Sequence, residues 1–111
     1  ADEPSSVGGD DFGPSPYELV NAGLAACTAM TLKMYAERKK IPLEEVYVYL
    51  NHSKKHSTDS EKEGYLDVIE KKLKFVGDLS TGEISKLKEI ASKCPVHKTL
   101  VKGAIIETEI I

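Results

Sequence analysis

The fold is decided by residues 15–34, SPYELVNAGLAACTAMTLKM, the first strong helical pattern in the chain. Ser15 is a favoured N-cap residue, Pro16 suits the first helical position, and Glu18 completes a capping box three residues after the serine. Apolar and small residues then recur at helical spacing. They spread further around the helix than on a surface helix, so the pattern predicts a central, buried helix that Pro42 closes.

The rest of the chain carries strand and helix patterns in turn. β-Branched, aromatic and alternating apolar residues indicate strands, and apolar residues at helical spacing indicate helices. The predicted elements are a strand at 46–50, a polar hairpin loop at 52–64, a strand at 65–76, helices at 80–93 and 94–102, and a last strand at 104–110. This order predicts one α+β domain with a largely antiparallel sheet.

Composition excludes several classes of function. With 111 residues, 41% of them hydrophobic, the chain has room for one modest core. A net charge of −3 with mixed signs gives no basic face for nucleic acid, and no apolar run approaches the roughly 20 residues that span a bilayer. There is no secretory pattern at the start, and two cysteines are too few for a secreted disulfide scaffold. We therefore expect a cytoplasmic protein without nucleic-acid or membrane partners.

The two cysteines, Cys27 and Cys94, are the main candidates for chemistry. Cys27 lies in the apolar helical run, where a free cysteine also packs as a small hydrophobic residue. Cys94 directly precedes Pro95 at the start of a predicted helix, where the helix dipole and unpaired N–H groups favour a thiolate. Local sequence therefore favours Cys94 as the more acidic thiol, with a merely structural role as the alternative. Two thiols that a fold brings together support reversible thiol–disulfide chemistry.

The histidines are weaker candidates. His97 stands one turn after Cys94, where it either orients the thiol or caps helix carbonyls. His52 and His56 fall in the predicted polar loop without a cysteine nearby, so we expect them to be solvated and expect no metal site.

Three segments of the chain resemble the OsmC/Ohr family. GPSPYEL at 13–19 and AACTAMTL at 25–32 are similar to the central helix of that family, and KCPVHKTL at 93–100 is similar to its second cysteine segment. The resemblance extends from about residue 9 to the carboxyl end. It is nearest to the branch that carries GPSPYEL and CPVHKTL rather than to the best-characterised hydroperoxidases.

The resemblance implies an OsmC-like fold, with an antiparallel sheet packed on long central helices, in an intertwined homodimer with active sites at the interface. It implies thiol-dependent reduction of organic hydroperoxides, with hydrogen peroxide as a further substrate and no metal, flavin or haem. Cys27 would be oxidised to a sulfenic acid, Cys94 would resolve it as a disulfide, and a dithiol reductant would restore both thiols. Residues 1–111 would form a single domain that lacks the amino-terminal strands of the full family domain.

The same resemblance raises the question of what charge activates Cys27, because burial disfavours a thiolate. In the family an arginine from an amino-terminal strand and a glutamate lie beside this cysteine. The single arginine here, Arg38, stands eleven residues beyond Cys27. The glutamate position falls on Tyr17, with Glu18 one residue later and turned by about 100° around the helix. Tyr17, Glu18 and His97 are therefore the supporting candidates.

Two other functions compete with the peroxidase. One is a non-enzymatic OsmC-like dimer that binds a small apolar ligand or acts as a redox-sensitive stress protein. The other is a structural disulfide between the two cysteines.

Overall fold

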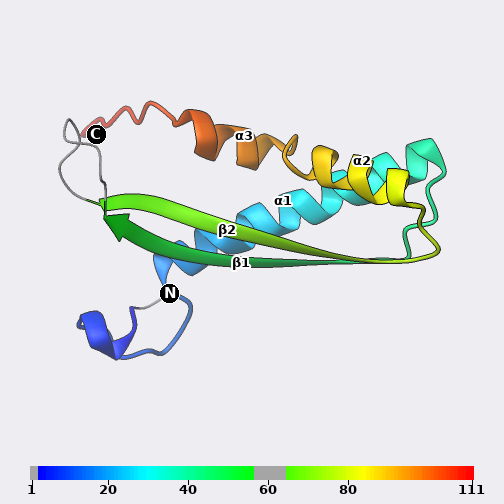
Figure 1. The fold of residues 1–111 in the computed structure, drawn as a ribbon. Helices are drawn as coiled ribbons and strands as arrows, with labels where there is room; N and C mark the ends of the chain where they lie inside the picture. The colour runs from blue at the N-terminus through cyan, green and yellow to red at the C-terminus, as the bar shows by residue number, and fades with distance from the viewer. Residues whose placement is uncertain (1–2, 57–64) are drawn as a thin grey trace.

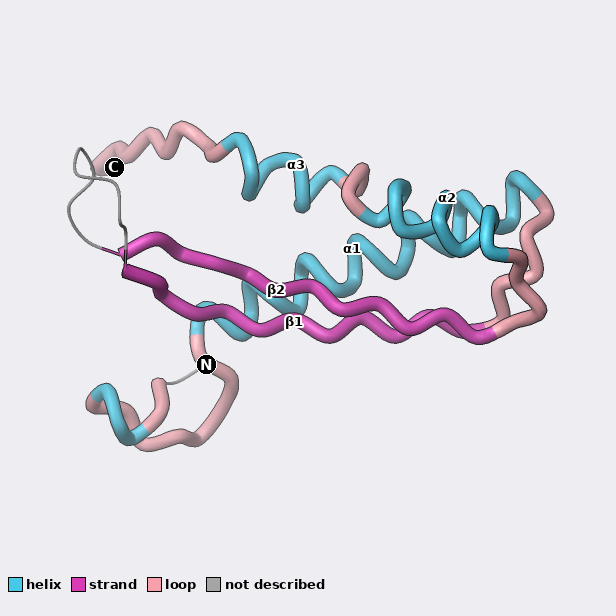
Figure 2. Tube along the Cα trace, in the orientation of Figure 1, coloured by secondary structure: helices cyan, strands magenta, loops and turns pink. Residues whose placement is uncertain are grey.

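Three α-helices lie on one side of a long two-stranded antiparallel hairpin in the computed structural model, which describes residues 3–56 and 65–111 (Figure 1). The elements are a 3₁₀ turn at Ser5–Val7, α1 at Pro16–Lys39, β1 at Glu45–His56, β2 at Tyr65–Val76, α2 at Thr81–Ala91 and α3 at Pro95–Lys102. α1 contacts β1, α2 and α3, and the last two helices follow one another along it (Figure 2). No helix within the described ranges is long and apolar enough to cross a membrane.

The start of α1 confirms the predicted capping box. The Glu18 backbone N–H donates to Ser15 Oγ at 3.2 Å, and the Ser15 N–H donates to Glu18 Oε1 at 3.4 Å. The prediction of a central, buried helix is confirmed for one side of α1 only, because in the single chain Met30 and Met34 are 63% and 68% exposed. The buried stripe follows a four-residue spacing and consists of Leu24, Thr28, Leu32 and Ala36.

The first strand is longer than its composition predicts. β1 and β2 pair along their whole length, from Glu45 opposite Val76 to His56 opposite Tyr65. The predicted loop at 52–64 therefore starts too early, and its residues 57–64 lie outside the described part of the chain. Pairing with β2 extends the strand through polar residues that would favour a loop on their own.

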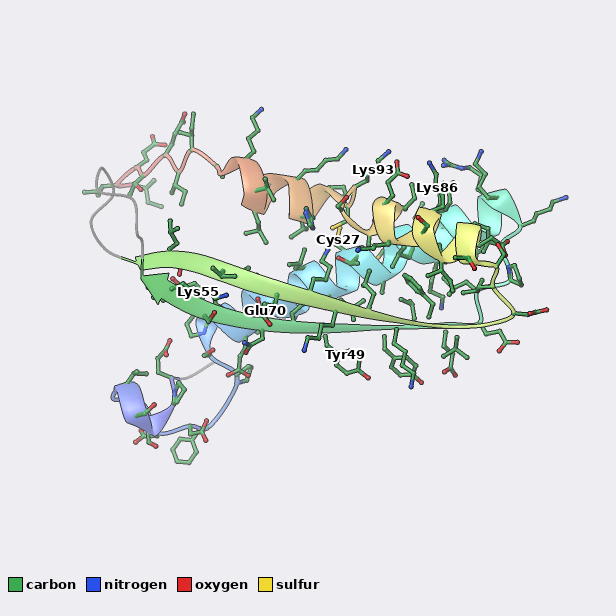
Figure 3. The ribbon with its side chains drawn as sticks, viewed as in Figure 1. Cys27, Tyr49, Lys55, Glu70, Lys86 and Lys93 are labelled. Atoms are coloured by element: carbon green, nitrogen blue, oxygen red, sulfur yellow. The ribbon has the colours of Figure 1, made fainter. Side chains whose placement is uncertain are left out.

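Alternation along the strands separates an inner face, which packs on the helices, from an outer face. Outer residues such as Tyr47 and Tyr49 are 42% and 56% exposed, and Tyr49 points away from the helices (Figure 3). The inner face packs on a core of Leu32, Leu87, Ile90 and Ala91 through Val46, Leu73 and Phe75. Lys71 shares the β2 face of Leu73 and Phe75, so its side chain is directed toward the helices.

The last two helices have their predicted boundaries within two residues. A second capping box joins Ser80 and Glu83, with hydrogen bonds of 3.1 Å and 2.9 Å. Pro95 opens α3 and Gly103, with φ of 87°, ends it in the left-handed region that favours glycine.

The strand predicted at 104–110 is wrong for this chain. Residues 104–111 have no strand pairing among the described residues, and Ile105, Ile106 and Ile110 are 91%, 87% and 98% exposed. The segment continues from α3 and has no strand beside it to pair with (Figure 1). An apolar pattern favours a strand only where a neighbouring strand accepts its hydrogen bonds.

Leu87 is fully buried at the centre of the core, so Leu87→Ala should lower the free energy of unfolding by about 2–5 kcal/mol through lost contacts and a residual cavity. Urea denaturation measures this loss. The matched control is Ile84→Ala on the same helix, where the side chain is 44% exposed and the loss should stay below about 1 kcal/mol. Equal losses for the two variants would contradict the described packing of α2.

Candidate functional site

The two thiols meet where α1 passes the start of α3. Cys94 is the N-cap of α3 and is 0% exposed. Its Sγ accepts a hydrogen bond from the His97 backbone N–H at 3.2 Å and lies 3.6 Å from Thr28 Oγ1. The Cys27 side chain lies near enough to Cys94 to lower the pKa of that thiol. Both cysteines are free, and Cys27 is only partly buried, close to the junction of α2 and α3 (Figure 3).

Local sequence explains why Cys94 takes this place. Pro95 has the fixed φ of a first helical residue and needs no N–H partner, so the helix starts there and the preceding residue becomes the N-cap. The cap side chain then accepts from the N–H three residues on, as a serine or aspartate would. Here the accepting atom is sulfur, so the helix start directs its dipole at the thiol.

A lysine ammonium completes the site. Lys71 Nζ donates to Thr28 Oγ1 at 2.9 Å and to the Ala91 carbonyl oxygen at 3.1 Å. It also lies 2.9 Å from His97 Nδ1, and because an ammonium only donates, this ring nitrogen is the acceptor. The ammonium therefore connects β2 with one residue on each of the three α-helices.

These contacts determine the acidity of Cys94. Burial raises the pKa of its thiol, but hydrogen bonds from the His97 N–H, Thr28 and Cys27, together with the charge of Lys71, outweigh burial and lower that pKa. The direction agrees with the acidity that local sequence favours for Cys94.

The pKa values of Lys71 and His97, the two basic groups of the site, are both lowered. Burial lowers the pKa of Lys71, and the negative charge of the two cysteines opposes this effect. Burial and the nearby ammonium of Lys71 also lower the pKa of His97, which favours the neutral ring that accepts from Lys71.

Two of the three supporting candidates lie at the far end of α1. Glu18 serves in the capping box, and Tyr17 stacks on His52 with ring centroids 4.2 Å apart and planes at 16°. They precede Cys27 by nine and ten residues, which is about 13–15 Å along the helix axis. Within this chain neither side chain is placed to act on the thiol. The third candidate, His97, lies in the site but orients Lys71 through its ring and Cys94 through its backbone.

The expectation that His52 is a solvated loop residue is wrong. Its side chain is 14% exposed and Nε2 lies 2.9 Å from Asp67 Oδ1, across the strand pair. In the described part of the chain no three His, Cys, Asp or Glu side chains are grouped so as to hold a metal. The side chain of His56 lies outside the described residues.

Thr28 and Lys71 were not among the predicted site residues, although the sequence pattern places both on inner faces. Thr28 occupies the buried stripe of α1, four residues after Leu24 and four before Leu32. Lys71 alternates with Leu73 on one face of β2, so the period of the strand places it on the inner face.

A cavity of about 340 Å³ has Lys71 and His97 of the site in its wall. Its other lining residues are Leu24, Asp67, Ile69, Leu100 and Val101. The mostly apolar wall suits the hydrocarbon part of a small organic molecule, with the polar groups gathered on the Lys71 and His97 side.

The family model described as OsmC-like protein matches residues 8–109. The chain belongs to the OsmC-like family. No curated protein matches it. Its fold is similar to an organic hydroperoxide resistance protein OsmC from Legionella pneumophila, at 25% identity and a TM-score of 0.71, over 89% of this chain and 70% of that one.

Two further solved structures share the fold. The OsmC-like protein from Mycoplasma pneumoniae has 24% identity and a TM-score of 0.69, over 89% of this chain and 68% of that one. A putative organic hydroperoxide resistance protein from Vibrio cholerae, with captopril in one of its active sites, has 20% identity and a TM-score of 0.65. It is matched over 89% of this chain and 66% of its own length.

Thr28→Val should raise the pKa of Cys94, because the substitution keeps the buried shape and removes the hydroxyl beside the sulfur. In a Cys27→Ser background, the ultraviolet absorbance of the thiolate should titrate about 0.5–1 pH unit higher than with threonine present. Thr31→Val, about one turn further along α1 and in the wall of a different groove, is the matched control and should leave the midpoint in place. An unchanged midpoint in Thr28→Val would show that the hydroxyl does not stabilise the thiolate.

Proposed function

We propose that the protein is a thiol-dependent peroxidase that reduces organic hydroperoxides, and also hydrogen peroxide, through Cys27 and Cys94. The observation that carries the proposal is that two free thiols, Cys27 and Cys94, lie together and that the pKa of Cys94 is lowered. Membership of the OsmC-like family and the similarity to an organic hydroperoxide resistance protein support the same reaction.

The greater exposure of Cys27 indicates that it reacts with the peroxide before Cys94 does. Cys27 is partly buried, whereas Cys94 is 0% exposed behind it, so a peroxide reaches the first sulfur more easily. The apolar cavity beside Lys71 and His97 offers a place for the organic group of the substrate.

The reaction proceeds in two steps. Cys27 gives its proton to the neighbouring Cys94 thiolate and its Sγ attacks the terminal peroxide oxygen. The O–O bond breaks, and the alkoxide takes up that proton from Cys94 and leaves as the alcohol. Cys94, again a thiolate, then attacks the sulfenic sulfur of Cys27, and the S–O bond breaks. The hydroxide that leaves takes a proton from solvent, so one hydroperoxide and two thiols give one alcohol, one water and one disulfide.

A dithiol reductant closes the cycle by returning two electrons and two protons to the disulfide. The reaction as written uses only sulfur chemistry and requires no cofactor. Because the resting state needs both thiols reduced, a reducing compartment such as the cytoplasm suits it.

We propose a homodimer on the basis of uncovered apolar surface. Met30 and Met34 of α1 are more than half exposed, and a groove of about 830 Å³ lies beside Met34, Tyr35 and Ile90. The exposed isoleucines of residues 104–111 add to the apolar surface. A second copy of the chain would cover these groups and would supply a strand for the unpaired segment.

One competing function uses the same cavity without catalysis. Its apolar lining would also hold a small apolar ligand in a non-enzymatic, redox-sensitive protein. In that case cysteine substitution would leave ligand binding intact and there would be no peroxide turnover to lose.

Cys27→Ser should abolish turnover of cumene hydroperoxide with a dithiol donor, because no sulfenic acid forms. Cys94→Ser should slow Cys27 oxidation, because it removes the thiolate that takes the Cys27 proton. It should also prevent disulfide formation, so the sulfenic acid that does form should accumulate and be trappable by dimedone. Coupled assays with cumene hydroperoxide and hydrogen peroxide, followed by mass spectrometry, measure both. Full turnover in Cys27→Ser would reject the proposed function.

Met34→Glu should weaken association, because it places a charge in the apolar groove beside α1. Sedimentation velocity should show a dimer for the parent protein and a shift toward monomer for the variant. Ser85→Glu adds the same charge at an exposed site on α2 and should remain dimeric. A monomeric parent protein would reject the homodimer.

A further inference from the structure

We propose that Lys71 is a positioning residue of the thiol site, which acts through the Thr28 hydroxyl to hold Cys94 as a thiolate before peroxide arrives. The proposal rests on the proposed function for its role in turnover. It assigns to a strand lysine the positive charge that a thiolate at the buried Cys94 requires.

All three protons of the Lys71 ammonium have an acceptor. A lysine ammonium has three protons, and the three acceptors around Nζ are Thr28 Oγ1 at 2.9 Å, His97 Nδ1 at 2.9 Å and the Ala91 carbonyl oxygen at 3.1 Å. Because each acceptor belongs to a different helix, the charge has one position relative to all of them.

The hydroxyl proton of Thr28 is directed at Cys94 Sγ. Lys71 donates to Oγ1, so this oxygen already serves as an acceptor there. Its own proton is free to point at Cys94 Sγ, 3.6 Å away, and a thiolate at that position only accepts. The chain of donors therefore runs from the ammonium through the hydroxyl to the sulfur.

The hydrogen bond from Lys71 also determines the tautomer of His97. Since Nδ1 accepts from Lys71, the ring proton is on Nε2 and the ring is neutral.

The titratable groups near the ammonium are Cys27 on α1 and Cys94 and His97 at α3, with Asp67 in the wall of the same cavity. Asp67 is paired with His52 and Lys54, which leaves the thiols as the anionic groups that face Lys71.

The consequence for turnover is a fast second step. With Cys94 held as a thiolate, the sulfenic acid on Cys27 meets a nucleophile as soon as it forms. Without the charge, the thiolate fraction at a pH below the midpoint falls about tenfold for each pH unit that the midpoint rises. A more basic thiolate is also more nucleophilic, so disulfide formation should slow only about threefold for that change.

The test is the titration of Cys94 in a Cys27→Ser background, followed by thiolate absorbance without any peroxide. Lys71→Met should raise the midpoint by about 1 pH unit, and Lys71→Arg should restore much of the difference because it keeps the charge. Lys72→Met removes a neighbouring charge on the outer face of β2 and should leave the midpoint unchanged. If Lys71→Met does not fold, Lys71→Gln replaces the ammonium with a neutral donor and should raise the midpoint in the same way.

An unchanged midpoint in the folded Lys71→Met or Lys71→Gln variant overturns the proposal, as does an equal rise in Lys72→Met. In the two-cysteine protein, Lys71→Met should also increase the amount of sulfenic acid trapped by dimedone after one equivalent of cumene hydroperoxide. The titration needs no turnover, so the role of Lys71 stands or fails separately from the peroxidase, which is tested by Cys27→Ser.

Discussion

The side chain of Lys71 reaches from β2 to all three α-helices, and the geometry of the thiol site depends on those hydrogen bonds. Its acceptors are Thr28 on α1, the last residue of α2, and His97 on α3. A partly buried ammonium is costly unless its protons are all bonded, so the four elements are held in one arrangement around it. That arrangement is also the one that places Cys27 and Thr28 beside Cys94. The hydrogen bonds of Lys71 therefore both fix the packing of these elements and place a positive charge near the thiols.

Elements with local causes could be predicted from the sequence. The capping boxes of α1 and α2 and the proline and glycine that bound α3 depend on residues three or four apart, and the structure has them where they were expected. Elements with distant causes could not be predicted in the same way. The polar end of β1 is a strand because β2 lies beside it. Residues 104–111 are not a strand, because no strand in the described part of the chain pairs with them.

The candidate site also contains residues with local causes, which the sequence predicted, and residues with distant causes, which it did not. Cys94 was identified as the acidic thiol from the helix start that it caps, which is a local feature. Lys71 was missed because a lysine among alternating charges reads as solvent-facing, although the period of the strand placed it with Leu73 and Phe75. Tyr17 and Glu18, the supporting candidates at the glutamate position of the family, have structural tasks at the start of α1.

The ammonium beside the cysteines has a consequence for the return half of the proposed cycle. It stabilises the reduced pair, in which one sulfur carries a negative charge, and gives no such benefit to a neutral disulfide. Oxidation therefore leaves a partly buried positive charge without its counter-charge. This difference makes the disulfide easier to reduce and its potential more oxidising, as expected when the reduced form is the stabilised one. The charge that prepares Cys94 to form the bond thus also favours its reopening by a dithiol.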